Sequence, residues 1–218
     1  MVRLVGANLN YSSWTIRAWL ALTHAEVPFR FFDVGMRTKP EWKETILSFS
    51  GAGKVPILVD GSLSVHESLA IAEYVAELAP HAQLWPDDVK LRARGRAISC
   101  EMLSGFSSLR SAMPVNLRGR SAVREPDAAT RWDIDRILSI WEASLTSSPS
   151  GGPFLLGRFS IADCMYFPVA TRFRTYGVAL PDFAQRYCEA LWRLPSVQQL
   201  ESIARETEPI AEYDAVLR

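Results

Sequence analysis

The chain has 218 residues, of which 48% are hydrophobic and 22% are charged. Such a length and composition are typical of a soluble globular protein with one large domain or two small ones. Lys and Arg together number 24, as do Asp and Glu, so the formal net charge is zero. The charge therefore gives no reason to expect nucleic acid or an anionic membrane as a partner.

Cysteine and histidine are few and widely spaced. The 3 cysteines are an odd number without a C-x-x-C pair, which argues against a disulfide framework, a zinc site and a dithiol redox centre. No apolar run approaches the about 20 residues of a membrane span, and the N-terminus lacks the apolar core of a signal peptide. We expect a cytoplasmic protein that binds neither a metal ion nor a membrane.

The first predicted elements form a strand, a helix and a second strand. The short alternating run "RLVGANL" predicts a strand, and the spacing of Ile16 and Trp19 predicts a helix over about residues 13–25. Residues 29–34, "FRFFDV", predict the second strand. Because a helix connects the two strands, we expect them to pair in parallel through a right-handed crossover.

The next elements complete an α/β unit. Residues 40–48 predict a helix, and a glycine-rich loop, "SGAGK", follows. The runs "VPILVD" and "SLSV" predict two strands, joined at Asp60-Gly61, which is a strong signal for a tight hairpin. The segment "ESLAIAEYVAELA" then predicts a helix. The order of this half is β-α-β-α-β-β-α.

The pattern changes after residue 78. The segment "APHAQLWPDD" holds two prolines and no periodicity, so we interpret residues 79–87 as a linker between a domain over 1–78 and a domain over 88–218. No convincing strand follows. Helical spacing recurs over residues 98–113, 134–145, 160–175 and 183–194, and "SVQQ" from Ser196 fits the capping box of a last helix.

Three segments carry a resemblance to a known family. "GKVPILVDGSLSVHESLAIAEYVAE" resembles the glutathione-binding segment of cytosolic glutathione transferases, and "FLLGRFSIADCMYFPVATRFRTYG" resembles the start of the central buried helix of their helical domain. With "NYSSWTIRAWLAL" they lie in the family's order and spacing. The resemblance, to bacterial-type members and to the serine-type zeta and tau classes, covers essentially the whole chain. It implies a thioredoxin-like α/β domain followed by an all-α domain.

The resemblance also implies how glutathione is held. In this family the proline that matches Pro56 follows a cis peptide bond, which turns the N–H and C=O of Val55 toward the cysteinyl part of glutathione. Ser68 and the free N–H groups of its helix would hold the γ-glutamyl carboxylate, and Glu67 would pair with the amine. The alternative is that both residues only cap the helix. Lys54 is either a ligand of the glycyl carboxylate or a solvated loop lysine.

The cluster "NYSS" is the candidate for thiol activation. A free thiol has a pKa of about 8.5, and hydroxyl donors at a helix N-terminus favour the reactive thiolate. Serine-type classes place their catalytic serine seven residues before an arginine that matches Arg17, and that position here is Asn10. Ser12 matches the cysteine of the zeta class's Ser-Ser-Cys motif. We predict Ser12 or Ser13 as the thiolate donor and Asn10 as a contact; the alternative is that the serines only cap the helix.

The helical domain would supply the pocket for an electrophile. Its predicted walls, for which core packing is the alternative, are Met102, Phe106, Tyr166 and Tyr176. Arg172 and Arg174 lie near the end of a helix expected to be buried, where an arginine needs an anion or a carbonyl partner. Zeta enzymes use an arginine in this neighbourhood for a dicarboxylate, although a structural ion pair is the alternative. Ser160 and Asp163 are predicted to form an N-cap pair.

Three functions therefore stay open. The first is a glutathione transferase, of the kind used in detoxification, that activates the thiolate for attack on a small apolar electrophile. The second is a zeta-type cis-trans isomerase of a maleylacetoacetate-like diacid, for which Arg172 and Arg174 are the support. The third is a non-catalytic binding protein, for which Asn10 is the support. We also expect a homodimer, because the linker and the stripe over residues 98–113 would present much apolar surface.

Overall fold

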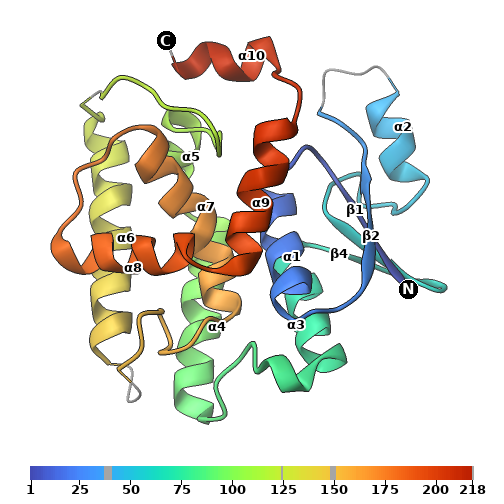
Figure 1. The fold of residues 1–218 in the computed structure, drawn as a ribbon, viewed down its shortest axis with the longest axis horizontal. Coiled ribbons are helices and arrows are strands. Elements are labelled where there is room, and N and C mark those ends of the chain that lie inside the picture. Colours follow the sequence, from blue (N-terminus) through green and yellow to red (C-terminus); the bar gives the residue numbers. More distant parts are fainter. Residues whose placement is uncertain (37–40, 124, 148–150, 218) are drawn as a thin grey trace.

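A four-stranded sheet with its helices lies beside a larger group of helices (Figure 1). The structure, a computed structural model, describes residues 1–36, 41–123, 125–147 and 151–217. The elements of the α/β part are β1 (Val2–Gly6), α1 (Ser13–His24), β2 (Phe29–Asp33), α2 (Trp42–Leu47), β3 (Ile57–Asp60), β4 (Leu63–His66) and α3 (Ser68–Leu78).

The sheet has the strand order β2-β1-β3-β4. β1 pairs with β2 in parallel, as predicted, and β3 pairs with both β1 and β4 in antiparallel fashion. The turn between β3 and β4 uses Gly61 with φ of 56°, a conformation that glycine adopts without strain. The predicted α/β order is confirmed.

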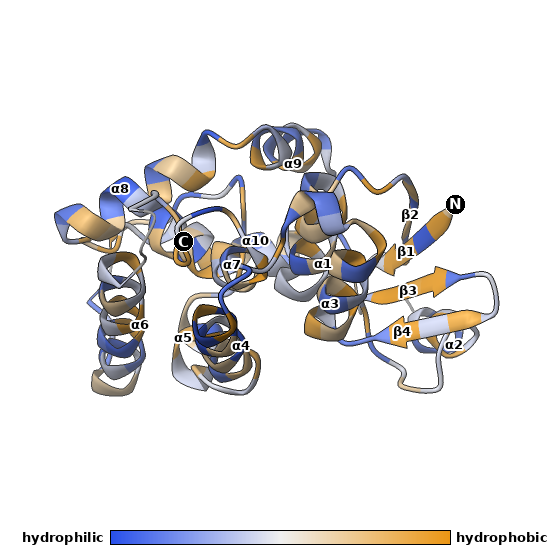
Figure 2. Ribbon diagram, turned by 90° about the horizontal axis from the view of Figure 1, so that it is seen from below, coloured by the Kyte–Doolittle hydropathy of each residue, from blue (hydrophilic) through white to orange (hydrophobic). Residues whose placement is uncertain are grey.

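Alternating side chains of the sheet enter two separate apolar layers. Leu4 and Leu58 join the main core under α1 and α3, whereas Val5 and Ile57 pack with Ile46 of α2 on the other face. Figure 2 shows α1 and α3 between the strands and the helical part. The sheet is therefore covered on both faces, and its main core continues into the helical part.

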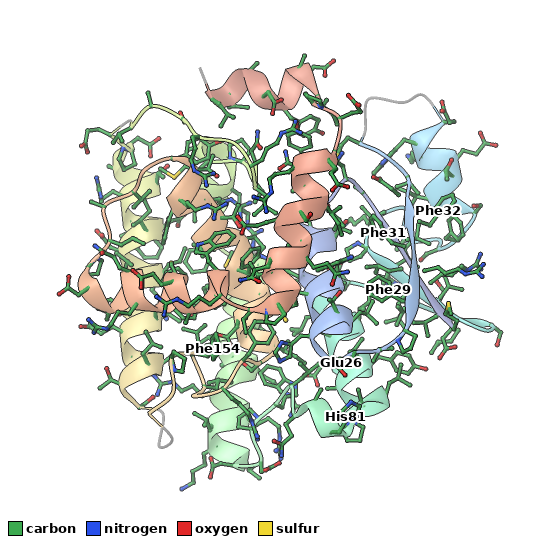
Figure 3. The ribbon with its side chains drawn as sticks, in the orientation of Figure 1. Glu26, Phe29, Phe31, Phe32, His81 and Phe154 are labelled. Atoms are coloured by element: carbon green, nitrogen blue, oxygen red, sulfur yellow. The ribbon has the colours of Figure 1, made fainter. Side chains whose placement is uncertain are left out.

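The edge strand β2 carries consecutive aromatic side chains (Figure 3). Phe29 packs edge-on against Trp19 of α1, with ring centroids 6.4 Å apart. Phe32 is 47% exposed and contacts Phe49 at 5.5 Å between ring centroids. The edge of the sheet is thus anchored to α1 on one side and left largely open on the other.

The helical part is built around α7. Its elements are η1 (Pro80–Ala82), α4 (Val89–Ser104), α5 (Ser107–Ala112), α6 (Ala128–Thr146), α7 (Ile161–Thr175), α8 (Asp182–Trp192), α9 (Pro195–Glu206), α10 (Ala211–Asp214) and η2 (Ala215–Leu217). Nearly every residue of α7 is buried, and α7 packs against α1, α3 and α4. The predicted capping box of Ser160 and Asp163 is present at its start. Among the described residues from 130 to 200, the only β-structure consists of isolated β-bridges.

Two helix predictions were wrong in detail. The stripe over residues 98–113 is not one helix, because α4 ends at Ser104 and Phe106 takes φ of 63° before α5 begins. The last long helix, α9, starts at Pro195, and its N-cap is Leu194. Proline suits the first position of a helix because its missing N–H would be unpaired there. The hydroxyl of Ser196 is buried without a hydrogen-bond partner among the described residues, so no capping box forms.

The stripe over residues 98–113, one of the two surfaces given as the reason for a homodimer, is not exposed. The side chains of that stripe, Ile98, Met102, Leu109 and Met113, are all buried inside this chain. They pack into the core and present no large apolar surface. The homodimer stays a prediction without this support.

Within the described ranges, no helix is both long and apolar enough to cross a membrane. In the same part of the chain, no group of three or more His, Cys, Asp or Glu side chains is arranged to hold a metal ion. Cys100, Cys164 and Cys188 are free thiols. Burial raises the pKa of the Cys164 thiol well above its ordinary value and that of Cys188 to about 12, so both stay protonated at neutral pH.

Candidate active site

A cavity of about 590 Å³ lies where the two parts of the molecule meet. Its walls come from the start of α1, the loop before β3, the start of α3, the end of α4 and α10. The predicted site residues that line it are Ser12, Ser13, Lys54, Val55 and Glu67. The fold therefore brings residues from three separate segments of the α/β part to one cavity.

Ser12 is the N-cap of α1. Its Oγ accepts a hydrogen bond from the Thr15 N–H at 3.3 Å and lies 2.9 Å from the Thr15 Oγ1. The Thr15 Oγ1 also accepts the Ala7 N–H at 3.0 Å, so its own proton is available to Ser12. If Thr15 donates to Ser12, the Ser12 proton is left for the cavity. Capping and donation to an anion are thus compatible in the same hydroxyl.

Unlike the Ser12 hydroxyl, the Ser13 hydroxyl has no hydrogen-bond partner among the described residues. Ser13 lines the same cavity. It is the first residue of α1, where backbone N–H groups are unpaired and the helix dipole favours an anion. Both serine hydroxyls can therefore donate to a negatively charged group in the cavity.

The Tyr11 phenol is fully engaged. It donates to the Asp214 Oδ1 at 2.9 Å and accepts from the Ile210 N–H at 3.0 Å and from Arg118 at 2.9 Å. Burial raises the pKa of Tyr11, so the phenol keeps its proton. Tyr11 therefore holds the C-terminal segment beside the cavity, and its ring lies 5.3 Å from that of Tyr213.

Asn10 lies in the joint between the two parts and is not among the residues that line the cavity. Its Nδ2 donates to the Asn116 Oδ1 at 2.9 Å, and its Oδ1 accepts the Arg118 N–H at 2.9 Å. Its carbonyl accepts the Leu117 N–H at 3.0 Å. This fully buried side chain bonds groups of the protein on both its nitrogen and its oxygen, which indicates a structural role.

Of the glutathione-binding candidates, Lys54, Val55 and Glu67 line the cavity, whereas Pro56 and Ser68 stand next to them in the sequence and are not among its lining residues. The Val55-Pro56 peptide bond is cis, as predicted. Glu67 has φ of 72°, which is uncommon for a residue other than glycine and costs about 1–3 kcal/mol. Ser68 is fully buried, and its Oγ has no hydrogen-bond partner among the described residues. A strained acidic residue beside an unsatisfied hydroxyl at a helix start is typical of a ligand site.

The predicted walls of the electrophile pocket lie elsewhere. The buried residues Met102 and Phe106 belong to the core, and the phenols of Tyr166 and Tyr176 donate to the carbonyls of Ile98 and Pro114, each at 3.1 Å. None of them lines the cavity, and their alternative, core packing, agrees with these contacts. The helical part lines the cavity with Leu103 and Tyr213 instead.

The two arginines of α7 also lie outside this cavity. Arg172 donates to the carbonyls of Met113 at 2.8 Å and Pro168 at 3.2 Å, and burial lowers its pKa to about 9. Arg174 forms an ion pair with Glu201 at 2.7 Å. Both contacts agree with the structural alternative and not with a role in holding a ligand in this cavity.

Sequence reasoning did not identify several residues of the site. Thr15 stands three positions after Ser12, which is where an N-cap finds its partner, so its role had a local signal. Trp14 and Trp42 line the cavity but sit in helical patterns that also suit a core. Tyr213 had no signal, because the tail after Glu208 shows no clear pattern.

Comparison with known proteins identifies the family. The sequence model of the glutathione S-transferase N-terminal domain matches residues 11–78, and that of the C-terminal domain matches residues 128–194. The chain belongs to the cytosolic glutathione transferase superfamily. This member of the superfamily is 30% identical over 176 residues to probable maleylacetoacetate isomerase 2 of Drosophila melanogaster, a match that spans 77% of this chain and 72% of that relative.

Two further relatives match over less of their length. A probable maleylacetoacetate isomerase of Caenorhabditis elegans is 34% identical over 105 residues, or 48% of each chain. The chloroplastic glutathione S-transferase L2 of Arabidopsis thaliana is 28% identical over 78% of this chain and 54% of its own. The chain thus matches about half the length of these two relatives.

Solved structures share the fold of this glutathione transferase family member. A glutathione transferase homolog from Burkholderia with bound glutathione covers 95% of this chain and 99% of its own, with a TM-score of 0.71 and 23% identity. Glutathione transferase F2 from Populus trichocarpa has a TM-score of 0.71 and 20% identity, over 95% of this chain and 100% of its own.

Proposed function

We propose that this chain binds glutathione in the cavity and activates its thiol for transfer to a small apolar electrophile. The observation that carries the proposal is that one cavity joins the hydroxyls at the start of α1 with the start of α3 and with Lys54. Glutathione has two carboxylates, an amine and a thiol. Lys54 would hold the glycyl carboxylate, Glu67 the amine, and Ser68 with the free N–H groups of α3 the γ-glutamyl carboxylate.

The backbone of Val55 would hold the cysteinyl part, which directs the sulfur toward Ser12 and Ser13. Their hydroxyls and the unpaired N–H groups of α1 would favour the thiolate over the thiol. After the thiol proton has passed to water, a sulfur electron pair forms a bond to the electrophilic carbon. In a substitution the leaving group departs with its bonding electron pair; in an addition the π electrons move to the neighbouring atom, which takes a proton from water. Trp14, Leu103 and Tyr213 would hold the apolar acceptor.

Serine substitutions test thiol activation. We expect Ser12→Ala or Ser13→Ala to raise the pKa of the bound thiol, by about one unit for every 1.4 kcal/mol lost. The pH profile of kcat/KM for the electrophile, measured at saturating glutathione, should then move upward. The control is Ser62→Ala, which changes an exposed serine of the β3–β4 turn. If neither substitution moves the profile, the hydroxyls do not activate the thiol.

Ser68 tests binding separately from activation. The carboxylate that it would contact carries the same charge before and after thiol ionisation. Ser68→Ala should therefore weaken glutathione binding, by about 1.5–3 kcal/mol, and leave the pH profile in place. Titration calorimetry with glutathione measures the loss; unchanged affinity would mean that the hydroxyl does not reach the ligand.

A cis-trans isomerase is the second candidate. Two of the relatives carry the name of probable maleylacetoacetate isomerase, and this is its support. Arg172 and Arg174 no longer favour it, since both contact protein groups outside the cavity. Assays with maleylacetoacetate and with a chromogenic electrophile, run side by side, separate the two activities. Failure to be retained on a glutathione column would favour a non-catalytic protein.

The homodimer, the cytoplasmic location and a role in detoxification stay predictions. Light scattering at micromolar concentration checks the first, and a monomer would contradict it.

A further inference from the structure

A second, smaller cavity of about 210 Å³ lies apart from the candidate active site. It opens between the loop over residues 117–120, the end of α7 and the end of α9. The charged residues that line it are Arg118, Arg120, Arg174, Arg205 and Glu201. Four guanidinium groups thus face one carboxylate around a cavity in a protein whose net charge is zero.

Arg174 is fixed at the wall of this cavity. Its Nη2 donates to the Glu201 Oε1 at 2.7 Å and to the Leu117 carbonyl at 3.2 Å. Its guanidinium carbon lies 3.6 Å from the ring centroid of Trp192, which holds the plane by a cation–π contact. The Nε–H of Arg174 is nevertheless buried without an acceptor among the described residues. A rigid, half-buried guanidinium therefore keeps an unsatisfied donor.

Arg120 and Arg205 add positive charge to the lining of the cavity. Neither forms an ion pair with another described residue. Arg120 donates only to carbonyls of its own loop, and burial together with the nearby Arg174 lowers its pKa. Arg118 has a single weak ion pair, with Asp214 at 3.5 Å. Even with Asp214 counted, two positive charges remain in excess.

We propose that this arginine cavity binds a phosphate-type oxyanion, either inorganic phosphate or the phosphate group of a small monoester. Guanidinium groups bind phosphate through paired N–H donors, and arginines that approach from three segments match a tetrahedral group better than a planar carboxylate. A phosphate group carries about −1.5 to −2 charges near neutral pH, which matches the excess. The cavity is larger than one phosphate needs, so part of an ester also fits.

A single residue, Arg118, would connect this site to the wall of the candidate active site. Arg118 lines the arginine cavity, while its Nη2 donates to the Tyr11 hydroxyl and its N–H to the Asn10 Oδ1. Tyr11 in turn lines the larger cavity. The proposal does not depend on glutathione binding, because its ligand, cavity and lining arginines are all distinct from those of the proposed function.

The test is titration calorimetry of the full chain with inorganic phosphate at constant ionic strength. Each hydrogen bond to a charged group that is lost should weaken binding about tenfold or more, so the double variant Arg120→Gln/Arg205→Gln should lose at least that factor. The matched control is Arg30→Gln/Arg186→Gln, which removes the same charge from two exposed arginines outside the cavity. The control should bind phosphate as the wild type does.

Two further arms identify the ligand. Phenyl phosphate replaces inorganic phosphate in one, and succinate replaces it in the other. Tighter binding of either phosphate compound than of succinate, lost in the cavity variant and kept in the control, supports the proposal. Absence of phosphate binding, an equal loss in both double variants, or equal or tighter binding of succinate overturns it. Thermal unfolding without phosphate checks that both variants are folded.

Discussion

Arg17 is an unusual residue, because it places a charge in the middle of a helix that is otherwise core. It is fully buried in α1, and none of its three side-chain nitrogens has a hydrogen-bond partner in the described part of the chain. Burial lowers its pKa well below the ordinary value, and the neighbouring cations Arg110 and Arg172 lower it further. Its contact is a cation–π interaction with the Trp14 ring at 4.5 Å, shared with Arg110 at 5.0 Å.

We expect Arg17→Met to stabilise the fold. Replacing buried ionic groups with apolar side chains of similar volume often raises the free energy of unfolding, by about 1–4 kcal/mol, because no charge has to be desolvated. Urea denaturation of wild type and variant measures the difference. Arg17→Lys is the control, since it keeps a buried charge and should bring no gain. A less stable Met variant would mean that Arg17 has a strong partner in the native protein.

At the scale of elements, α7 depends on its first turn. The Asp163 carboxylate accepts hydrogen bonds from the Leu155 N–H, from both the N–H and the hydroxyl of Ser160, and from the Tyr187 hydroxyl, at 2.8–3.1 Å. These contacts join the loop before α7, the cap of α7 and α8. One carboxylate therefore organises three segments of the helical part.

Burial nevertheless raises the pKa of Asp163 from 3.8 to about 6, although its donors favour the charged form. The folded chain then binds this proton more tightly than the unfolded chain. The resulting stabilisation is fully present below pH 3.8 and is lost as the pH rises through about 6. Between these values we expect this group to lower the free energy of unfolding by at most about 1.4 kcal/mol per pH unit.

A carbon-13 NMR titration of labelled aspartate checks this shift directly, with the Asp163 signal assigned through Asp163→Asn. The matched comparison is Asp127, the N-cap of α6, whose pKa is lowered chiefly by the backbone N–H of Thr130. Asp163 should titrate well above Asp127. Equal midpoints would show that the four donors offset the burial.

The elements that the sequence predicted well are those with a local cause. The helix from Ser13, the parallel strand pair and the Asp60-Gly61 hairpin each follow from residues a few positions apart. The break at Phe106 was missed because the apolar stripe continues on both sides of Gly105. Periodicity reports which face is apolar, and it does not report whether the backbone turns between two helices.

The site was predicted only where its residues come from such local motifs. Lys54 and Val55 line the cavity just before the β3–β4 hairpin, and Glu67 lines it at the start of α3. Both positions follow from these local motifs. Asn10 was interpreted from its place in a motif, whereas its partner Asn116 is 106 positions away. Tyr213 lies in the cavity wall beside Tyr11, a residue far from it in the sequence, and no pattern in the tail reveals this contact.

At the scale of the whole molecule, a clasp joins the two ends of the chain. Asp214 accepts hydrogen bonds from the Tyr11 hydroxyl at 2.9 Å and the Asn116 Nδ2 at 2.7 Å and pairs with Arg118. The clasp holds α10 over the joint between the two parts (Figure 1). It thereby places Tyr213 in the wall of the candidate active site.

We expect Asp214→Ala to raise KM for a bulky electrophile and to leave the affinity for glutathione nearly unchanged. The loss of two hydrogen bonds to a charged group, about 1.5–3 kcal/mol each, frees the Tyr213 wall, whereas the groups proposed to hold glutathione come from α1, α3 and the loop before β3. Steady-state kinetics with both substrates varied measure the split. Glu212→Ala, an exposed neighbour in the same helix, is the control. Equal changes for both substrates would contradict the assignment of this wall.

The clasp can form only late in the synthesis of the chain. Tyr11 and Asp214 are separated by 203 positions. At about 5–20 residues per second, a ribosome needs roughly 10–40 s to add that stretch. During this interval the Tyr11 phenol lacks the Asp214 carboxylate, and the cavity lacks the wall that Tyr213 forms. The pocket proposed for the acceptor is therefore completed only at the end of synthesis, after every group proposed to hold glutathione has been made.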